Sequence, residues 1–132
     1  MGLPILKAFV LCERIRNSTN DTGQMDLRGA GLDRFHGTGS FPHKFTFWAF
    51  IEVADEKPAG TLQLAIVRAD SGRRHFFREV MVTKPDPLSN LRTRIRLFDC
   101  EFPSPGIYFV ELWYDGFWVV DHRIRVLGVE GD

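Results

Sequence analysis

The sequence predicts an all-β protein, an antiparallel β-sandwich of about seven to eight strands. Three observations predict this fold class. Short apolar, β-favouring segments recur along the chain and are separated by turn residues. No segment has the apolar spacing of an amphipathic helix. The last third, residues 102–120, reads as a corner, a strand, a tight turn and another strand.

The expected strands follow one another along the chain. The first covers residues 5–13, and the polar run 17–23 ends it as a turn. A shorter strand is expected near 25–29, and the glycine-rich stretch after it predicts an irregular connection. Residues 44–53 are strongly β-favouring, and the Lys-Pro-Ala-Gly segment 57–60 ends that strand. The remaining strands are expected at 61–69, 74–83, 91–99, 105–113 and 117–127.

The terminal hairpin allows two registers. With a loop of only Asp115 and Gly116, Val110 would share a face with Asp121. With a three-residue loop, 114–116, Val110 opposes Val120 and one face becomes consistently apolar. A slip of one residue moves every side chain to the other face, so the three-residue loop is the predicted one.

The start of the penultimate strand, Gly106-x-Tyr108, is similar to the tyrosine corner of immunoglobulin-like sandwiches. Val110 would stand where antibody domains place a cysteine of the inter-sheet disulfide, so the core relies on packing instead. The natural core partners of Val110 and Leu112 alternate along the strand 44–53: Phe45, Phe47, Ala49, Ile51 and Val53. We therefore expect a single antiparallel immunoglobulin-like β-sandwich over residues 1–132.

Segments at both ends of the chain carry a family resemblance. Residues 8–13 and 27–31 resemble the opening of a bacterial family of small proteins, a domain of unknown function. Phe102-x-x-x-Gly106-x-Tyr108, Asp115-Gly116 and the final strand resemble the end of that family. The resemblance implies a cytoplasmic immunoglobulin-like sandwich, and it brings neither an activity nor catalytic residues.

Composition limits the possible partners. The formal net charge is +0, so no global field attracts nucleic acid or anionic membranes. No apolar run approaches the roughly 18 residues of a membrane span, and the N-terminus does not look like a signal peptide, so the expected location is cytoplasmic. Cys12 and Cys100 make no disulfide framework and are expected as reduced thiols.

The histidines suggest little chemistry. None of the four has another His or Cys at the spacing of a metal site, so no metal, cofactor or catalytic residue is predicted. His122 is expected on the core face opposite Tyr108, as a buried and hydrogen-bonded side chain. His36 lies near Asp33 in an expected loop and is the alternative candidate for a catalytic residue, although no motif in the sequence identifies a nucleophile for it. The segment Gly-Thr-Gly-Ser at 37–40 lacks the lysine of a phosphate-binding loop.

One sheet face combines arginines with aromatic rings. Strand periodicity places alternate residues of 91–99 on one face, beside the outward residues of 44–53. The members of this second surface are Trp48, Phe50, Arg92, Arg94 and Arg96. We expect these arginines to stack on the rings, and Glu52 to pair with one guanidinium, as ordinary contacts of a solvent-exposed surface without a binding role. Binding of RNA or single strands is the alternative for this surface.

The outward face of the terminal hairpin is the main candidate interface. The outward positions of strands that face water are normally polar, whereas the outward positions here are mostly large apolar side chains. Its members are Phe109, Glu111, Trp113, Phe117 and Val119. Cover by the N-terminal hairpin is the competing explanation.

The function expected from these features is that of a binding or assembly module, with a homodimer or an unidentified protein as the partner. One alternative is a hydrolase or transferase that uses a loop histidine, such as His36 with Asp33. The other is a small-ligand-binding sandwich that uses Trp48 or Trp113 as a stacking platform.

Overall fold

The computed structural model describes residues 3–17, 25–37 and 40–128. Across these residues the chain forms strands and no helix, so the predicted all-β class is confirmed, although the described residues form ten strands where seven to eight were predicted. The strands are β1 Ile5–Cys12, β2 Arg14–Asn17, β3 Met25–Arg28, β4 Arg34–His36, β5 His43–Ala54, β6 Ala59–Arg68, β7 Arg74–Thr83, β8 Leu91–Phe102, β9 Gly106–Tyr114 and β10 Phe117–Leu127. No helix in the described ranges is long and apolar enough to cross a membrane.

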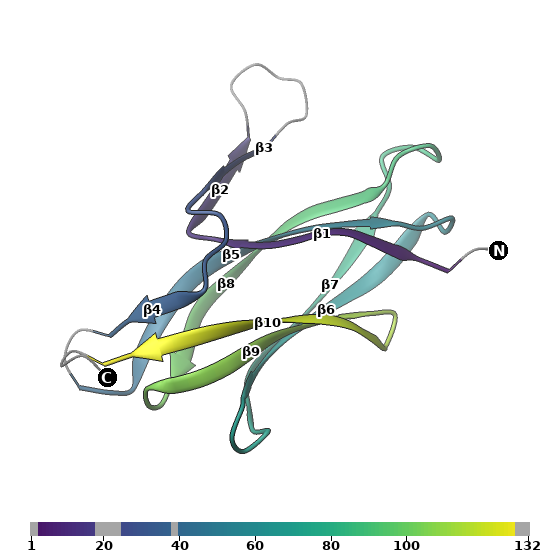
Figure 1. Ribbon diagram of the computed structural model, residues 1–132. Helices are drawn as coiled ribbons and strands as arrows, with labels where there is room; N and C mark the ends of the chain where they lie inside the picture. Colours follow the sequence, from purple (N-terminus) through teal and green to yellow (C-terminus); the bar gives the residue numbers. More distant parts are fainter. Residues whose placement is uncertain (1–2, 18–24, 38–39, 129–132) are drawn as a thin grey trace.

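The strands form two main sheets that pack face to face, and a small hairpin beside them (Figure 1). One sheet has the order β1-β5-β8, the other has the order β4-β10-β9-β6-β7, and β2 pairs with β3. Every pairing is antiparallel except that of β4 with β10, which is parallel. The predicted turn at 17–23 lies almost entirely outside the described residues.

The core lies between the two main sheets and is built from alternate residues of each strand. Phe47, Ala49, Ile51 and Val53 of β5 are buried, as the sequence predicted, and Phe45 is half-buried. They face the buried residues of the other sheet: Leu62, Leu64, Ile66, Tyr108, Val110, Leu112, Ile124 and Val126. Because strand side chains alternate between faces, burial of one face leaves the outer faces available for other contacts.

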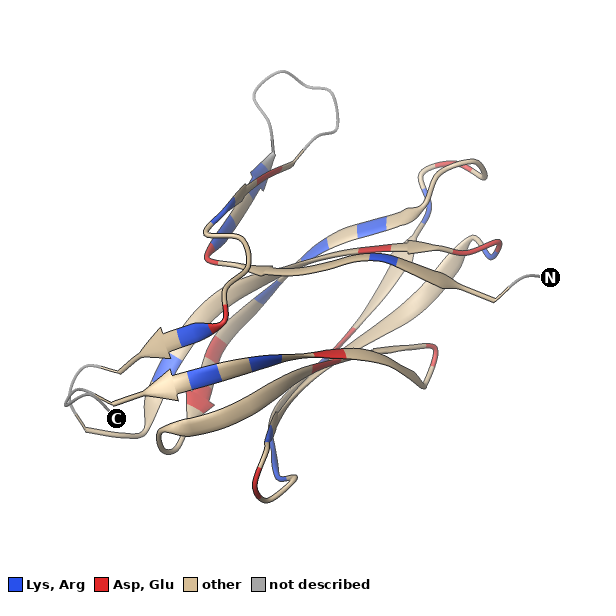
Figure 2. Cartoon of the chain, in the orientation of Figure 1, with Lys and Arg blue, Asp and Glu red and all other residues tan. Residues whose placement is uncertain are grey.

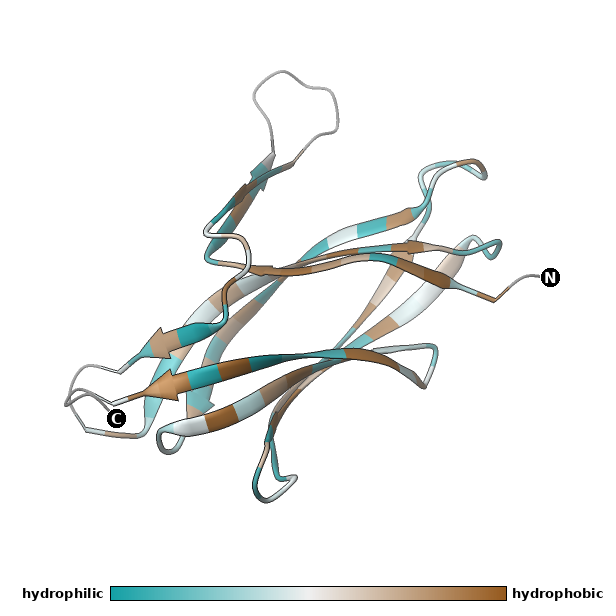
Figure 3. Ribbon diagram, in the orientation of Figure 1, coloured by the Kyte–Doolittle hydropathy of each residue, from teal (hydrophilic) through white to brown (hydrophobic). Residues whose placement is uncertain are grey.

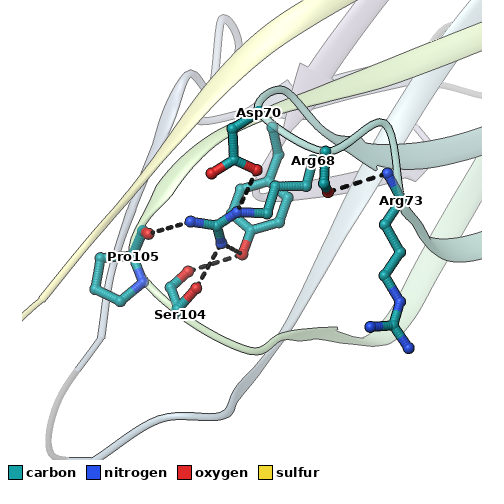
Figure 4. Close-up of polar contacts among 7 residues, drawn as sticks. Arg68, Asp70, Arg73, Ser104 and Pro105 are labelled. Atoms are coloured by element: carbon teal, nitrogen blue, oxygen red, sulfur yellow. Dashed lines mark hydrogen bonds and ion pairs between the residues drawn. The ribbon is translucent and has the colours of Figure 1, made fainter.

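A corner precedes β9, where Arg68 of β6 bonds to Ser104 and Pro105 (Figure 4). The fully buried Tyr108 donates its hydroxyl to the backbone oxygen of Ser104 at 2.7 Å. Arg68 donates from Nη1 to the Tyr108 hydroxyl at 2.7 Å and from Nη2 to the Pro105 oxygen at 3.1 Å. Gly106 has φ 151°, which residues with a Cβ rarely adopt, and a Cβ there would lie 2.9 Å from the Arg68 guanidinium, so the corner favours glycine.

The turn of the terminal hairpin is shorter than predicted. Phe117 pairs directly with Tyr114, so the loop consists of Asp115 and Gly116 alone, and the three-residue loop is wrong. Both loop residues have positive φ, 49° and 84°, which a tight two-residue turn requires. An Asp-Gly pair tolerates this conformation well, and the turn chemistry therefore outweighs the simple apolar alternation.

A β-bulge in β10 corrects the register after this turn. The pairing shifts between Trp118 and Val120, and Val119 is the extra residue. Val120 then opposes Leu112, and His122 opposes Val110, where the sequence predicted Val120. The inserted residue returns the apolar side chains of β10 to the core face in spite of the short loop.

β4 was not predicted, because its residues fall in the stretch expected as an irregular connection. Its backbone is anchored to β10: Gly37 N donates to Leu127 O at 2.8 Å, and Arg125 N donates to Asp33 O at 2.9 Å. Phe35 fixes the strand from the other side, because it is buried in the core.

The β2–β3 hairpin covers the outer face of the three-stranded sheet. Ile15 is 3% exposed and forms a small second core with Cys12 and Phe50. The partly buried residues around it are Ala8, Val10, Met25, Leu27 and Trp48. These contacts are all on the β1–β5 side, so the described part of this hairpin does not cover the outward face of β9 and β10.

Candidate functional site

The outer face of the five-stranded sheet carries large apolar side chains. In register, Trp113 lies beside Gln63 and Phe109 beside Val67. On β7, Phe77 is 46% exposed and Met81 is 73% exposed. We call Phe77, Met81, Phe109 and Trp113 the aromatic face. Figure 3 shows the alternation of apolar and polar residues along these strands.

Charged side chains are segregated along the strands of this face. Glu111 is paired with Asp121, and the next outward pair along the same strands is Phe109 with Arg123. On β7, the guanidinium of Arg74 lies 4.8 Å from the centre of the Phe77 ring. Figure 2 shows the acidic residue of β10 followed by basic residues towards the end of the strand. The face is thus acidic at one end and basic at the other.

The predicted interface residues divide between two places. Phe109, Glu111 and Trp113 share the outer face as expected, and Trp113 donates from Nε1 to Glu111 at 3.3 Å. Phe117 and Val119 do not join them, because the short turn and the bulge direct them to a pocket instead. The missed members are Phe77 and Met81, which the two-residue period of 74–83 would have placed on one face.

This second place is an apolar pocket of about 390 Å³ between the start of β1 and the terminal hairpin. Its lining residues are Leu3, Pro4, Leu6, Val53, Lys57, Tyr114, Asp115, Phe117, Trp118 and Val119. Leu3, Phe117 and Trp118 are exposed at its mouth. The pocket is large enough to hold a small apolar molecule.

Polar bonds fix the hairpin beside this pocket. Asp115 pairs with Lys57 and accepts a hydrogen bond from the Thr61 backbone N at 2.8 Å. The hydrogen bond from Lys57 lowers the pKa of the Asp115 carboxyl, and the Thr61 bond adds to this effect. Burial, supported by a hydrogen bond to Asp55, raises the pKa of Tyr114, which therefore stays a neutral donor.

The second surface has the predicted strand order. β8 lies beside β5, with Trp48 opposite Arg96 and Phe50 opposite Arg94. The guanidinium of Arg94 lies 5.9 Å from the Trp48 ring centre, and that of Arg92 lies 5.5 Å from the Phe50 ring centre. These arginines already stack on rings, and the β2–β3 hairpin packs against Phe50. The surface is therefore largely occupied by contacts within the chain.

Arg92 and Arg96 have their own partners. Arg92 is 3.5 Å from a carboxylate oxygen of Glu52, as predicted. The Arg96 guanidinium lies 4.6 Å from the ring centre of Phe98.

His122 forms a hydrogen bond on the core-facing side of β10. Its Nε2 donates to the Phe9 backbone oxygen at 2.5 Å, and the two rings stack at 4.6 Å. The hydrogen bond agrees with the prediction, but His122 is half-buried instead of buried, and the residue opposite it is Val110 and not Tyr108. This contact joins β1 of one sheet to β10 of the other.

Within the described part of the chain, no hydrogen bond or ion pair joins the two residues of the catalytic alternative, His36 and Asp33. His36 is exposed on β4, and the Asp33 carboxylate lies 3.5 Å from Arg34. Residues 38–39 of the Gly-Thr-Gly-Ser segment lie outside the described residues. Burial raises the pKa of Cys12 to about 11 and that of Cys100 to about 12, so both are inert thiols at neutral pH. In the described ranges, no three His, Cys, Asp or Glu side chains form a metal-binding group.

No protein-family model and no curated protein matches the chain, so the resemblance to a bacterial family stays a prediction. Among solved structures, the chain is similar to the crystal structure of beta-glucosidase from Listeria innocua in complex with isofagomine. The TM-score is 0.47 and the sequence identity is 10%, over 92% of this chain and 16% of that chain. The chain thus spans 16% of the length of that enzyme.

Proposed function

We propose that the protein is a binding and assembly module of the immunoglobulin-like type, and that it forms a homodimer through the aromatic face. The observation that carries this proposal is the group of apolar side chains on an outer sheet face that the β2–β3 hairpin leaves open: Phe77, Met81, Phe109 and Trp113. Apolar patches of this kind on small proteins usually mark interaction sites.

Two features support the immunoglobulin-like type. The first is the division of strands into β1-β5-β8 and β4-β10-β9-β6-β7, with neighbouring strands that are far apart in sequence. The second is the Tyr108 hydroxyl, which returns to the backbone upstream as in a tyrosine corner. The free thiols Cys12 and Cys100 fit a reducing compartment and support a cytoplasmic location.

The size of the face suits a small symmetric interface. β6, β7, β9 and β10 contain 9 to 11 residues each. At about 3.3 Å per residue and about 4.8 Å between strands, four such strands present roughly 600 Å². Stable complexes at the lower end of the size range bury about 600 Å² on each partner. A second copy therefore provides enough contact area.

The charge pattern favours a second copy as the partner. A twofold axis parallel to the sheet and perpendicular to its strands reverses the strand direction of the partner. β10 of one copy then lies antiparallel over β10 of the other, and Asp121 of each copy lies against Arg123 of its partner. This arrangement forms two pairs of opposite charges along β10 and so favours the reversed strand direction.

Analytical ultracentrifugation tests the dimer. Wild-type protein should sediment as a dimer at high micromolar concentration, and Trp113→Glu should yield a folded monomer, because it buries a charge without a partner at the centre. Phe98→Glu is the matched control, since Phe98 is an exposed aromatic residue of the other sheet. A monomeric wild type, or equal dissociation by both variants, would refute the proposal.

A second candidate function rests on the apolar pocket beside the terminal hairpin. Its volume of about 390 Å³ and the exposed Trp118 at its mouth suit a small apolar or aromatic ligand. The stacking platform is then Trp118 and neither Trp48 nor Trp113. Anilinonaphthalene sulfonate should bind with a fluorescence increase that Trp118→Ala removes and Trp113→Phe keeps. Equal binding by wild type and Trp118→Ala would exclude this pocket.

A further inference from the structure

Three arginines from two adjacent strands line a depression at the edge of the five-stranded sheet. Arg34 belongs to β4, and Arg123 and Arg125 belong to β10. Ile107 and Asp33 complete the lining, and the volume is about 190 Å³. We call these five residues the arginine pocket. It lies on the outer face of the five-stranded sheet, where Arg123 is the outward neighbour of Phe109.

The backbone pairing forces the positive charges together. Arg125 and Arg34 are direct neighbours in the parallel β4–β10 pair, and Arg123 lies two residues before Arg125 on the same face. Like charges at neighbouring positions of a sheet repel each other, and arginine stays protonated at any physiological pH. The strand pair holds this arrangement through the 2.9 Å bond from Arg125 N to Asp33 O.

Little within the described residues compensates these charges. Asp33 is the only carboxylate in the lining, and it lies 3.5 Å from Arg34. Neither Arg123 nor Arg125 forms an ion pair with any residue of the described ranges. Three guanidinium groups and one carboxylate leave a charge of +2 (3 − 1 = 2) around the depression.

We propose that the arginine pocket binds a phosphate dianion, the terminal group of a phosphomonoester. A dianion matches the charge of the pocket, and the planar guanidinium fork bonds to two phosphate oxygens at once. The volume lies below the roughly 300 Å³ of sites that enclose a whole ligand. The pocket therefore takes the phosphate group and leaves the rest of the ester outside.

Isothermal titration calorimetry at constant ionic strength tests the pocket with inorganic phosphate. Wild type should bind one phosphate per chain, and Arg34→Gln and Arg125→Gln should each raise Kd at least tenfold. Arg125→Lys should also weaken binding, because an ammonium group cannot form the two parallel bonds. Arg92→Gln is the matched control on the opposite sheet and should leave Kd unchanged. Circular dichroism melting checks that every variant is folded.

Two further ligands distinguish a soluble phosphomonoester from a lipid headgroup. The first is glycerol phosphate in solution, and the second is phosphatidylcholine vesicles that contain phosphatidic acid. Binding of glycerol phosphate assigns the pocket to soluble esters, and binding of the vesicles alone assigns it to lipid headgroups. The proposal is overturned if no ligand gives saturable binding, or if Arg92→Gln weakens binding as much as Arg125→Gln. Binding of oligothymidylate without any monoester binding also overturns it, because phosphodiesters carry a single charge per phosphate.

Discussion

Tyr108 connects the corner before β9 to the end of β6 through one hydroxyl group. The hydroxyl donates to Ser104 O and accepts from Arg68, and both bonds are 2.7 Å long. Tyr108→Phe removes both and leaves the Ser104 oxygen without this donor. We expect the free energy of unfolding to fall by about 1–2 kcal/mol, measured by urea denaturation.

Ser104→Ala provides the comparison for this prediction. It removes the hydroxyl that bonds to Arg68 but keeps the backbone oxygen that Tyr108 uses. The loss of stability should therefore be smaller than in Tyr108→Phe. Identical urea midpoints for wild type and Tyr108→Phe would show that the corner bond does not contribute to stability.

Asp115 makes stability depend on pH at the acid end. Its pKa in the folded protein is lowered, first by the hydrogen bond from Lys57 and then by that from Thr61 N. A lowered pKa gives stabilisation that is present above the unfolded value of about 3.9 and is lost as the pH falls through the folded value. Asp115→Asn should therefore destabilise the protein at pH 7, and the difference from wild type should vanish at strongly acid pH.

Urea denaturation at several pH values measures this difference. Asparagine tolerates the positive φ of position 115, so the substitution removes the charge and keeps the turn. Asp99→Asn is the matched control, because Asp99 is exposed and also has a positive φ, 52°. A stability difference between wild type and Asp115→Asn that is equal at acid and neutral pH would contradict the prediction.

Among the elements, the long strands and the short β3 were predictable, and the short strands β2 and β4 were not. The bounds expected for 74–83 and 117–127 agree with β7 and β10, because alternation over ten residues or more is a strong signal. β4 has three residues, of which only Phe35 is buried, and so its sequence shows no alternation of apolar and polar residues that could predict a strand. β2 was not predictable for the same reason, because Ile15 is its only residue in the small second core with Cys12 and Phe50.

The terminal hairpin shows why a register can be predicted wrongly from a correct criterion. The sequence required an apolar core face, and it also offered an Asp-Gly turn that works best with two residues. Both conditions hold only when Val119 is an extra residue, and a two-residue period has no place for one. Sequence alone therefore presented two registers, and the folded chain uses neither.

The packing of the β2–β3 hairpin on the three-stranded sheet can be tested at Ile15. Ile15 anchors it over Phe50, with Trp48 at the edge of the contact. Ile15→Asp should lift the hairpin from the sheet and cost about 2–4 kcal/mol, because it buries an unpaired charge. Trp48 should then become more accessible to acrylamide quenching.

Ile5→Asp is the control for the hairpin, since Ile5 is an exposed residue of β1. It should leave both the urea midpoint and the quenching near those of wild type. A well-folded Ile15→Asp protein with unchanged quenching would mean that the hairpin does not depend on this contact.

For the whole molecule, the sites depend on neighbours that the sequence does not reveal. Arg34 meets Arg125 only because β4 crosses to the second sheet, and Phe77 shares a face with Trp113 only because β6 lies between their strands. The aromatic residues of the hairpin were identifiable from their alternation. Their partners on β7 required the order of the sheet.

The proposed dimer predicts the effect of exchanged charges. Asp121→Arg makes the outer face of β10 basic, and Arg123→Asp makes it acidic. Each variant alone should be monomeric, because like charges then face each other across the twofold axis. An equimolar mixture should form a heterodimer, detected by ultracentrifugation. A monomeric mixture, or variants that dimerise as wild type does, would count against the twofold arrangement.

The parallel pairing of β4 with β10 also has a mechanical consequence. β1 begins at one end of the molecule and β10 ends at the other, so a pull between them runs along β10 (Figure 1). The ladder bonds between strands lie across this direction, and they carry the load together in shear instead of opening one at a time. β10 is held in this way by β9 on one side and β4 on the other. A chain stretched by its ends would therefore yield abruptly, when its last strand slides free of both neighbours at once.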